Sequence, residues 1–237
     1  MRILGLETSG QRAGVALLDE GAVAAAAEIQ AAGRTGERIL DLVDALLEAL
    51  EWELTGIDRI AVDAGPGSFT GLRVGLGLAK GLSLGAGAGV VAVSSLDVLA
   101  RQAGGEGPVL AAMNAPRGMV YGGLFIGEAA QPAVAEAAWE PALLWDAVVA
   151  ALAGRPLGPI RVVGPGAIQL GPGAPAFGRG VSFHGDERPA AEWVARRASR
   201  SDARVLDEAQ LARLEPRYLR GADVRRPKDR TRTLPSP

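Results

Sequence analysis

Hydrophobic and polar positions follow two different periods along the first hundred residues. Apolar residues recur at helical spacing from 35 to 50, opposite a stripe of Asp and Glu, which predicts an amphipathic helix. Short apolar runs at 3–8, 15–18 and 23–29 predict three strands, and an Asp-Glu-Gly turn predicts a hairpin between the last two. The chain therefore begins with three strands that can pair antiparallel, followed by a helix.

A second strand-and-helix unit follows the first helix. The apolar run at 60–62 predicts a strand, and a Gly-Pro-Gly turn separates it from an apolar helix over residues 69–84. Another strand is predicted at 90–93, and the sequence Ser-Ser-Leu-Asp at 94–97 is typical of a capped helix start. Strands and helices thus alternate in this region, which indicates an α/β fold.

The chain changes character at the Gly-rich segment 104–108, where we place a domain boundary. Beyond it, the pattern predicts strands at 109–113, 120–126 and 160–163, helices at 143–152 and 192–200, and a Gly/Pro-rich loop at 164–180. The expected units are an N-terminal subdomain of residues 1–103 with a C-terminal return at about 206–224, a second subdomain of residues 104–205, and a disordered basic tail at 225–237.

The predicted helix at 69–84 contains an unusual number of glycines. An interior helical glycine costs about 1 kcal/mol relative to alanine, so something must approach this backbone closely. The glycines form two rows with a spacing of four residues, namely Gly67, Gly71 and Gly75, and Gly77, Gly81 and Gly85. One row can pack on the sheet and the other on a neighbouring helix, which we expect to be 35–50. The exposed remainder predicts a protein interface, and packing within the chain alone is the alternative.

A second candidate site lies at the Gly-Pro-Gly turn and the end of the first strand. The turn lacks the Gly-Lys-Ser/Thr of a P-loop, and its glycine spacing differs from that of a dinucleotide fingerprint. A helix N-terminus can still bind an anion, and an acid at a strand end can hold phosphate-bound Mg²⁺. A plain capped turn and a solvated acid are the alternatives. The residues of this weak nucleotide site are Glu7, Thr8, Ser9, Gly65, Gly67 and Ser68.

Composition narrows the functional classes. The 237-residue chain is 48% hydrophobic, has no cysteine, and contains one histidine, His184, which we expect at the surface. The sequence has neither paired histidines nor an HExxH motif, so it predicts no metal site. It also lacks an apolar run long enough for a membrane span. We therefore expect a cytoplasmic protein. The net charge is −2, yet residues 211–237 hold eight Lys/Arg against three Asp/Glu. Such a tail can meet nucleic acid, an acidic partner or solvent.

One segment carries a resemblance to a known family. Residues 65–75, GPGSFTGLRVG, closely resemble the signature of the TsaB family, the dimerisation subunit of the bacterial complex that forms threonylcarbamoyladenosine in tRNA. Supporting segments are LGLETS at 4–9, VSSL at 93–96 and EPRYLR at 215–220. The resemblance covers about residues 1–126 well and then fades until 215–220.

The resemblance implies an actin-like ATPase (ASKHA, RNase H-like) fold of two related subdomains. It also implies a non-catalytic subunit that binds and activates a TsaD-type catalytic subunit through its first two helices, here 35–50 and 69–84. On this basis the expected interface residues are Ile39, Leu42, Val43, Leu46, Phe69, Leu72, Arg73, Gly75, Leu76, Ala79 and Lys80.

Further partners follow from the same resemblance. It implies a TsaE-type ATPase in the assembly, tRNA bound through the complex, and modification of the adenosine beside the anticodon in tRNAs reading ANN codons. We expect no cofactor in the isolated subunit, with ATP and metal on the partner subunits. An exposed apolar patch predicts a homodimer when the chain is alone.

Several positions depart from the family pattern. Glu7 replaces the usual aspartate, and Arg34-Thr35 stands where a histidine commonly precedes Ser or Thr. Asn114 and Met119 replace an aspartate and a glutamate, so the polar contacts of those acids are not carried over. The alternative function is a stand-alone actin-like kinase or ATPase that uses Glu7 and the turn. A protease is disfavoured because no nucleophile constellation is present.

Overall fold

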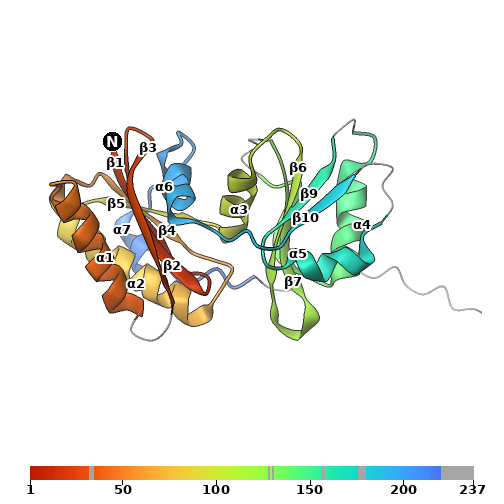
Figure 1. Ribbon diagram of the computed structural model, residues 1–237, viewed down its shortest axis with the longest axis horizontal. Coiled ribbons are helices and arrows are strands. Elements are labelled where there is room, and N and C mark those ends of the chain that lie inside the picture. Colours follow the sequence, from red (N-terminus) through yellow and green to blue (C-terminus); the bar gives the residue numbers. More distant parts are fainter. Residues whose placement is uncertain (32–34, 128, 130, 156–157, 176–179, 220–237) are drawn as a thin grey trace, which may run out of the picture.

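Two five-stranded sheets form the frame of the protein (Figure 1). The computed structural model describes residues 1–31, 35–127, 129, 131–155, 158–175 and 180–219. The first sheet has the order β3-β2-β1-β4-β5, with β1 Arg2–Glu7, β2 Arg12–Asp19, β3 Ala22–Gln30, β4 Arg59–Asp63 and β5 Gly89–Val93. The second has the order β10-β9-β6-β7-β8, with β6 Pro108–Asn114, β7 Val120–Ile126, β8 Val134–Trp139, β9 Ile160–Val163 and β10 Val181–His184.

The two sheets share one topology. In each, the first three strands in sequence pair antiparallel, and the first strand then pairs parallel with the fourth, which pairs parallel with the fifth. A long connection between parallel strands normally contains a helix, as it does here. This repeated unit confirms the expected actin-like fold of two related α/β subdomains.

Helices cover both faces of the first sheet. Helices α1 (Thr35–Ala49) and α2 (Phe69–Ala86) lie on its outer face (Figure 1), where Leu4 and Leu6 of β1 pack among their apolar residues. Helix α6 (Ala191–Ser199) lies on the opposite face with Ile3. The alternate residues of a strand point to opposite faces, so a strand covered on both sides becomes continuously apolar. The apolar run at the start of the chain has this cause.

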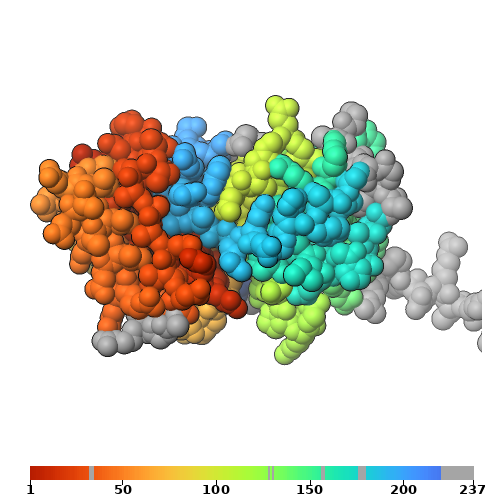
Figure 2. Space-filling view, viewed as in Figure 1, coloured from red at the N-terminus to blue at the C-terminus, as the bar shows by residue number. Residues whose placement is uncertain are grey.

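Helix α6 links the two halves of the molecule. It packs against β1, β2 and β4 of the first sheet, whereas residues 192–200 were expected in the second subdomain. The return to the first sheet therefore begins near residue 191, earlier than the expected 206. Helix α3 (Ser95–Ala103) contacts α6 and packs against β6 and β7 of the second sheet. Figure 2 shows the region around α6, in blue, between the red and green lobes.

The remaining helices complete the second subdomain and the C-terminal segment. Helix α4 (Pro141–Leu152) covers the outer face of the second sheet, and α5 (Ala167–Leu170) lies in a segment that was expected to be loop. Helix α7 (Glu208–Ala212) follows α6. Three short 3-10 helices complete the described structure, at Leu54–Gly56, Pro116–Gly118 and Gly171–Gly173.

Candidate functional site

One row of glycines lets α2 lie directly on the end of β1. A Cβ atom at Gly71 would overlap the carbonyl oxygen of Thr8, and one at Gly75 would overlap the Thr8 hydroxyl. A Cβ at Gly67, in the turn before the helix, would lie 2.6 Å from the Cβ of Ser9. Real side-chain carbons do not approach so closely, so this row serves packing within the chain. It explains three of the glycines as the closest contact between α2 and the sheet.

Two glycines of the second row, Gly77 and Gly81, face outward rather than packing on α1 as was expected, whereas a Cβ at Gly85 would contact Leu54. A Cβ at Gly77 or Gly81 would have no heavy atom within 4 Å, apart from neighbouring helix backbone. Leu84 on the same helix is 84% exposed, the largest exposure among the large hydrophobic residues that the structure describes. Side chains normally cover the backbone of a helix, so the backbone becomes accessible where an outward-facing residue is glycine. We call the surface formed by Gly77, Gly81 and Leu84 the α2 outer face.

The expected interface residues divide into two groups. The side chains or backbones of Ile39, Val43, Leu72, Gly75, Leu76 and Ala79 are buried in this structure. They belong to the core between the helices and the sheet, because the apolar stripe of an amphipathic helix turns inward. These six positions are therefore buried within the described chain, and their part in a partner interface stays a prediction. Phe69 and Arg73 are exposed, while Leu42, Leu46 and Lys80 are half-buried, and their partner contacts stay a prediction.

The C-terminal segment crosses the surface of α2. Lys80 Nζ donates hydrogen bonds to the carbonyl oxygens of Ala212 at 3.1 Å and Leu214 at 3.0 Å. Further along, the rings of Phe69 and Tyr218 stack with centroids 5.8 Å apart. A groove of about 250 Å³ remains between Gly77 and the segment. The 215–220 motif thus lies against the same helix as the GPGSFTG signature, over the residues that the structure describes.

We expect Lys80→Met to loosen this C-terminal segment. The change removes two hydrogen bonds from a charged donor, which should cost about 1 kcal/mol, because both carbonyl oxygens can be hydrated instead. Amide hydrogen exchange over residues 212–219 should become faster. Arg188→Met is the control, since Arg188 is exposed and does not line the groove beside this segment. Wild-type exchange rates in Lys80→Met would contradict the role assigned to Lys80.

A buried pair of acids lies beneath the N-terminus of α2. Glu7 and Asp63 end the parallel neighbours β1 and β4, and the carboxyl ends of parallel strands meet at one edge. Glu7 Oε1 accepts hydrogen bonds from Ser9 N at 2.6 Å and Ser9 Oγ at 2.5 Å. Asp63 Oδ1 accepts from Gly65 N and from Ser95 Oγ, both at 2.7 Å. Asp63 Oδ2 has no hydrogen-bond partner among the described residues.

Burial makes both acids hard to ionise. Desolvation, together with the neighbouring charge of Asp63, raises the pKa of Glu7 to about 8. Desolvation also raises the pKa of Asp63 to about 6, although the hydrogen bonds from Ser95 and Gly65 act in the opposite direction. With these pKa values the pair of carboxyl groups holds about one proton near neutral pH. The pair is therefore a titrating group of the interior.

The turn before α2 covers the carboxyl groups of Glu7 and Asp63. Ser68 N donates to Ser9 O at 2.7 Å, and Gly67 rests on Ser9. The six residues of the expected nucleotide site are thus brought together, and Ser68 caps α2 by accepting from Gly71 N at 3.3 Å. Glu7 is only 4% exposed. Their use for a nucleotide stays a prediction. Sequence reasoning did not include Asp63 in the site, although its place at the end of a strand parallel to β1 could have indicated it.

Other expected positions lie away from both sites. Asn114 is exposed, and its Oδ1 accepts a hydrogen bond from Gln169 Nε2 at 2.7 Å, so the amide pairs with a neutral partner. Met119 is half-buried, and His184 is exposed at the end of β10, as expected. Arg34 and the basic tail at 225–237 lie outside the described residues.

Neither a metal cluster nor a membrane span occurs in the part of the chain that the structure describes. The described residues include no group of three or more His, Cys, Asp and Glu side chains placed to hold a metal ion. In the same part of the chain, every helix is too short or too polar to span a membrane.

Curated proteins similar to this chain include TsaB proteins of several bacteria. The chain is 42% identical to the tRNA threonylcarbamoyladenosine biosynthesis protein TsaB of Escherichia coli over 124 residues, or 51% of this chain and 53% of that protein. It is 36% identical to TsaB of Bacillus subtilis over 126 residues, or 53% and 55%. The chain thus spans about half the length of the curated relatives that it matches.

The solved structures match over a greater length. A crystal structure of an uncharacterized Pseudomonas aeruginosa protein with similarity to peptidase YEAZ superposes with a TM-score of 0.74 at 29% identity, covering 92% of this chain and 99% of that one. These relatives confirm the resemblance to TsaB and the fold that it implied. The family model of TsaD, tRNA N6-adenosine threonylcarbamoyltransferase, matches residues 29–213. The chain therefore belongs to the TsaD family of proteins, in which its curated relatives are the TsaB proteins.

Proposed function

We propose that this chain is a non-catalytic scaffold subunit that binds and activates a TsaD-type catalytic subunit. The reaction of that assembly is the N6-threonylcarbamoylation of the adenosine next to the anticodon in tRNAs reading ANN codons. Support comes from relatives named for tRNA threonylcarbamoyladenosine biosynthesis. In this role the chain is a binding component rather than an enzyme.

The observation that carries the proposal is the α2 outer face. A helix that has interior glycines where no described residue lies within 4 Å of the missing side chain needs another reason for them. A partner helix is such a reason, since small residues allow two helix backbones to come close together. The α2 outer face then offers accessible backbone at Gly77 and Gly81, next to the exposed apolar side chain of Leu84. Exposed apolar residues next to accessible backbone favour protein docking over catalysis.

The buried acid pair argues against the stand-alone kinase or ATPase. A carboxylate that acts on Mg²⁺-nucleotide must reach solvent, whereas Glu7 and Asp63 lie under the turn at 65–67. Their raised pKa values also reduce the negative charge available for a cation at neutral pH. Both properties favour a site that now serves packing.

The proposal includes further partners. A TsaE-type ATPase joins the assembly, tRNA is bound through the complex, and ATP and metal reside on the partner subunits. The chain alone forms a homodimer through its exposed apolar surface, and it works in the cytoplasm. The partner subunits and the tRNA follow from the family resemblance, the homodimer from the exposed apolar surface, and the cytoplasmic location from the composition.

Reconstitution tests the function itself. We expect threonylcarbamoylation of tRNA by the TsaD-type and TsaE-type subunits, in an otherwise complete reaction mixture, to depend on this chain. Omission of this chain should reduce the rate of tRNA modification roughly tenfold or more, because the catalytic subunit then lacks the interface that activates it. Full activity without the chain would overturn the proposal, and so would modification by the chain alone.

We expect Leu84→Arg to prevent co-elution with the TsaD-type subunit. A buried charge at the centre of an apolar interface should cost about 2 kcal/mol or more of binding free energy. The side chain is exposed in the free protein, so the thermal unfolding temperature should not change. Val149→Arg on α4 is the control, because it places the same charge at an exposed apolar residue far from α2. Co-elution of Leu84→Arg as in wild type would refute the assignment of this face.

A further inference from the structure

A cavity between the two subdomains is lined by charged residues that the proposed function does not use. It has a volume of about 490 Å³, within the usual range of small-molecule sites. Its wall is formed by the end of β5, the start of α3, the strand β8 and the segment that follows α6. Both sheets therefore contribute residues to one concave surface.

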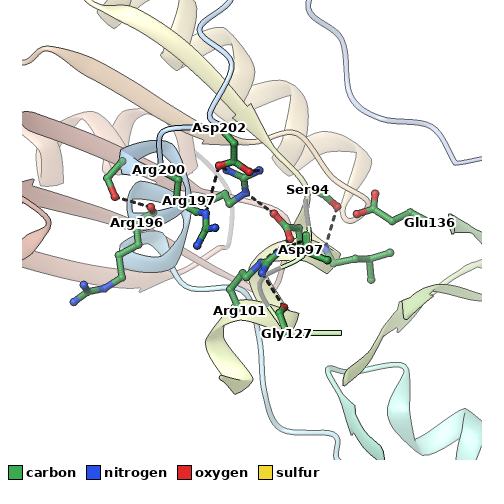
Figure 3. A network of polar contacts seen from close by, with 12 residues as sticks. Ser94, Asp97, Arg101, Gly127, Glu136, Arg196, Arg197, Arg200 and Asp202 are labelled. Carbon is green, nitrogen blue, oxygen red and sulfur yellow. Dashed lines mark hydrogen bonds and ion pairs between the residues drawn. The ribbon is translucent and has the colours of Figure 1, made fainter. Parts of the chain in front are cut away.

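The acids in this wall are already engaged by arginines. Asp97 accepts from Arg101 Nε at 3.0 Å and from Arg197 Nε at 2.7 Å (Figure 3). Asp202 lies 3.0 Å from Arg197 and 3.3 Å from Arg200. Each of these two carboxylates thus has two guanidinium neighbours. Such acids contribute little uncompensated negative charge to the cavity.

The remaining acid of the wall is compensated as well. Glu136, whose side chain is only 9% exposed, forms an ion pair with Arg217 at 2.8 Å. It lies beside Ser94 at the start of α3 in Figure 3. Desolvation raises the pKa of Glu136, while the charge of Arg217 lowers it. The cost of burying this carboxylate is offset by its arginine.

Arg204 then supplies a cation without a described counter-ion. It lines the cavity, it is exposed, and among the described residues it has no hydrogen-bond or ion-pair partner. The N-terminus of α3, capped by Ser94, opens on the same wall and adds positive potential. An acidic chain with a net charge of −2 thus keeps a local surplus of positive charge between its two subdomains.

We propose that this cavity binds a phosphate group through Arg204, with Arg217 and the start of α3 at its rim. Arginine presents a planar fork of N–H donors that matches phosphate oxygens, and the carboxylates of this wall are already paired with other arginines. The phosphate can come from a small molecule or from the backbone of an RNA, and the cavity is open enough to the surface for either. The site is separate from the α2 outer face, so it stands or falls independently of the proposed function.

Titration of the full chain with inorganic pyrophosphate tests the small-molecule source. At constant ionic strength, calorimetry should show saturable binding by wild type. Arg204→Ala should raise the Kd about tenfold, the size expected for losing a charge-assisted hydrogen bond. Arg188→Ala is the matched control, because Arg188 is also exposed but does not line the cavity. Thermal unfolding should show that both variants fold as wild type does.

Binding of unmodified tRNA, measured by fluorescence anisotropy, tests the other source. A loss in Arg204→Ala but not in Arg188→Ala, without pyrophosphate binding, would support the phosphate site and assign it to an RNA backbone. Saturable pyrophosphate binding that depends on Arg204 would assign it to a small molecule. The proposal is overturned if neither probe binds, or if Arg204→Ala and Arg188→Ala have the same effect on both probes.

Discussion

Gly71→Ala is expected to be the most destabilising single-methyl change on α2. The added Cβ would overlap the carbonyl oxygen of Thr8, a backbone atom at the end of a central strand. Neither side can yield easily, because β1 is paired on both edges and α2 is anchored in the core by Leu72 and Leu76. Overpacking of this kind costs about 3 kcal/mol, and backbone contacts put it at the upper end. Urea unfolding followed by circular dichroism measures the loss.

Gly81→Ala provides the matched control on the same helix. No heavy atom outside the neighbouring helix backbone lies within 4 Å of the position that its Cβ would take, so the change should stabilise the chain by about 1 kcal/mol through helix propensity alone. The two variants differ only in which row receives the methyl group. Equal stability of Gly71→Ala and Gly81→Ala would show that α2 does not rest on the end of β1 as described.

Periodicity predicted the first subdomain well, because its helices are strongly amphipathic or apolar. Helix α1 begins at Thr35 as expected and ends one residue before the predicted position. Helix α2 begins at Phe69 and extends two residues beyond 84. In both cases the pattern reflects burial against a sheet, which local sequence records directly.

The elements that were missed depend on tertiary contacts. Strand β8, with the sequence VAEAAW, is rich in alanine, which has a low strand propensity, and it forms by pairing with β7. Strand β10 is only four residues long and follows a Gly/Pro-rich stretch. Helix α6 was predicted as a helix, yet its place on the first sheet could not be read from its own residues. Only the small residues Ala191 and Ala195 hint at this, since they allow close approach to Gly5.

The helical glycines of α2 could be predicted to need a close neighbour, but their exact contacts could not. Sequence alone does not reveal that one row meets the end of β1 while Gly77 and Gly81 meet nothing within the described chain. The buried acid pair is equally hard to predict from the sequence. The parallel pairing of β1 and β4 brings Glu7 and Asp63 together, and pairing partners are set by topology rather than by spacing.

The buried acids should make the protein less stable as pH rises. A carboxyl group whose pKa is higher in the folded state binds more protons there than in the unfolded chain, so the free energy of unfolding falls with increasing pH. The fall should begin near the ordinary carboxyl pKa of about 4 and continue to about 8, the pKa of Glu7. Each pKa unit corresponds to about 1.4 kcal/mol, and between pH 5 and pH 8 Glu7 spans about three units and Asp63 about one, so we expect a loss on the order of 5 kcal/mol.

Glu7→Gln should change the shape of this profile, because the amide keeps the acceptor for Ser9 without ionising. Its stability should fall only up to about pH 6, the pKa of Asp63, and stay level above it. Between pH 4 and pH 8 the variant should therefore lose about 4 kcal/mol less stability than wild type. Glu53→Gln, at an exposed position before the first 3-10 helix, should keep the wild-type profile. The free energy of unfolding is measured by urea unfolding at each pH. Parallel pH profiles for wild type and Glu7→Gln would show that Glu7 ionises in the folded state at no cost. Water would then reach the acid pair past the turn at 65–67.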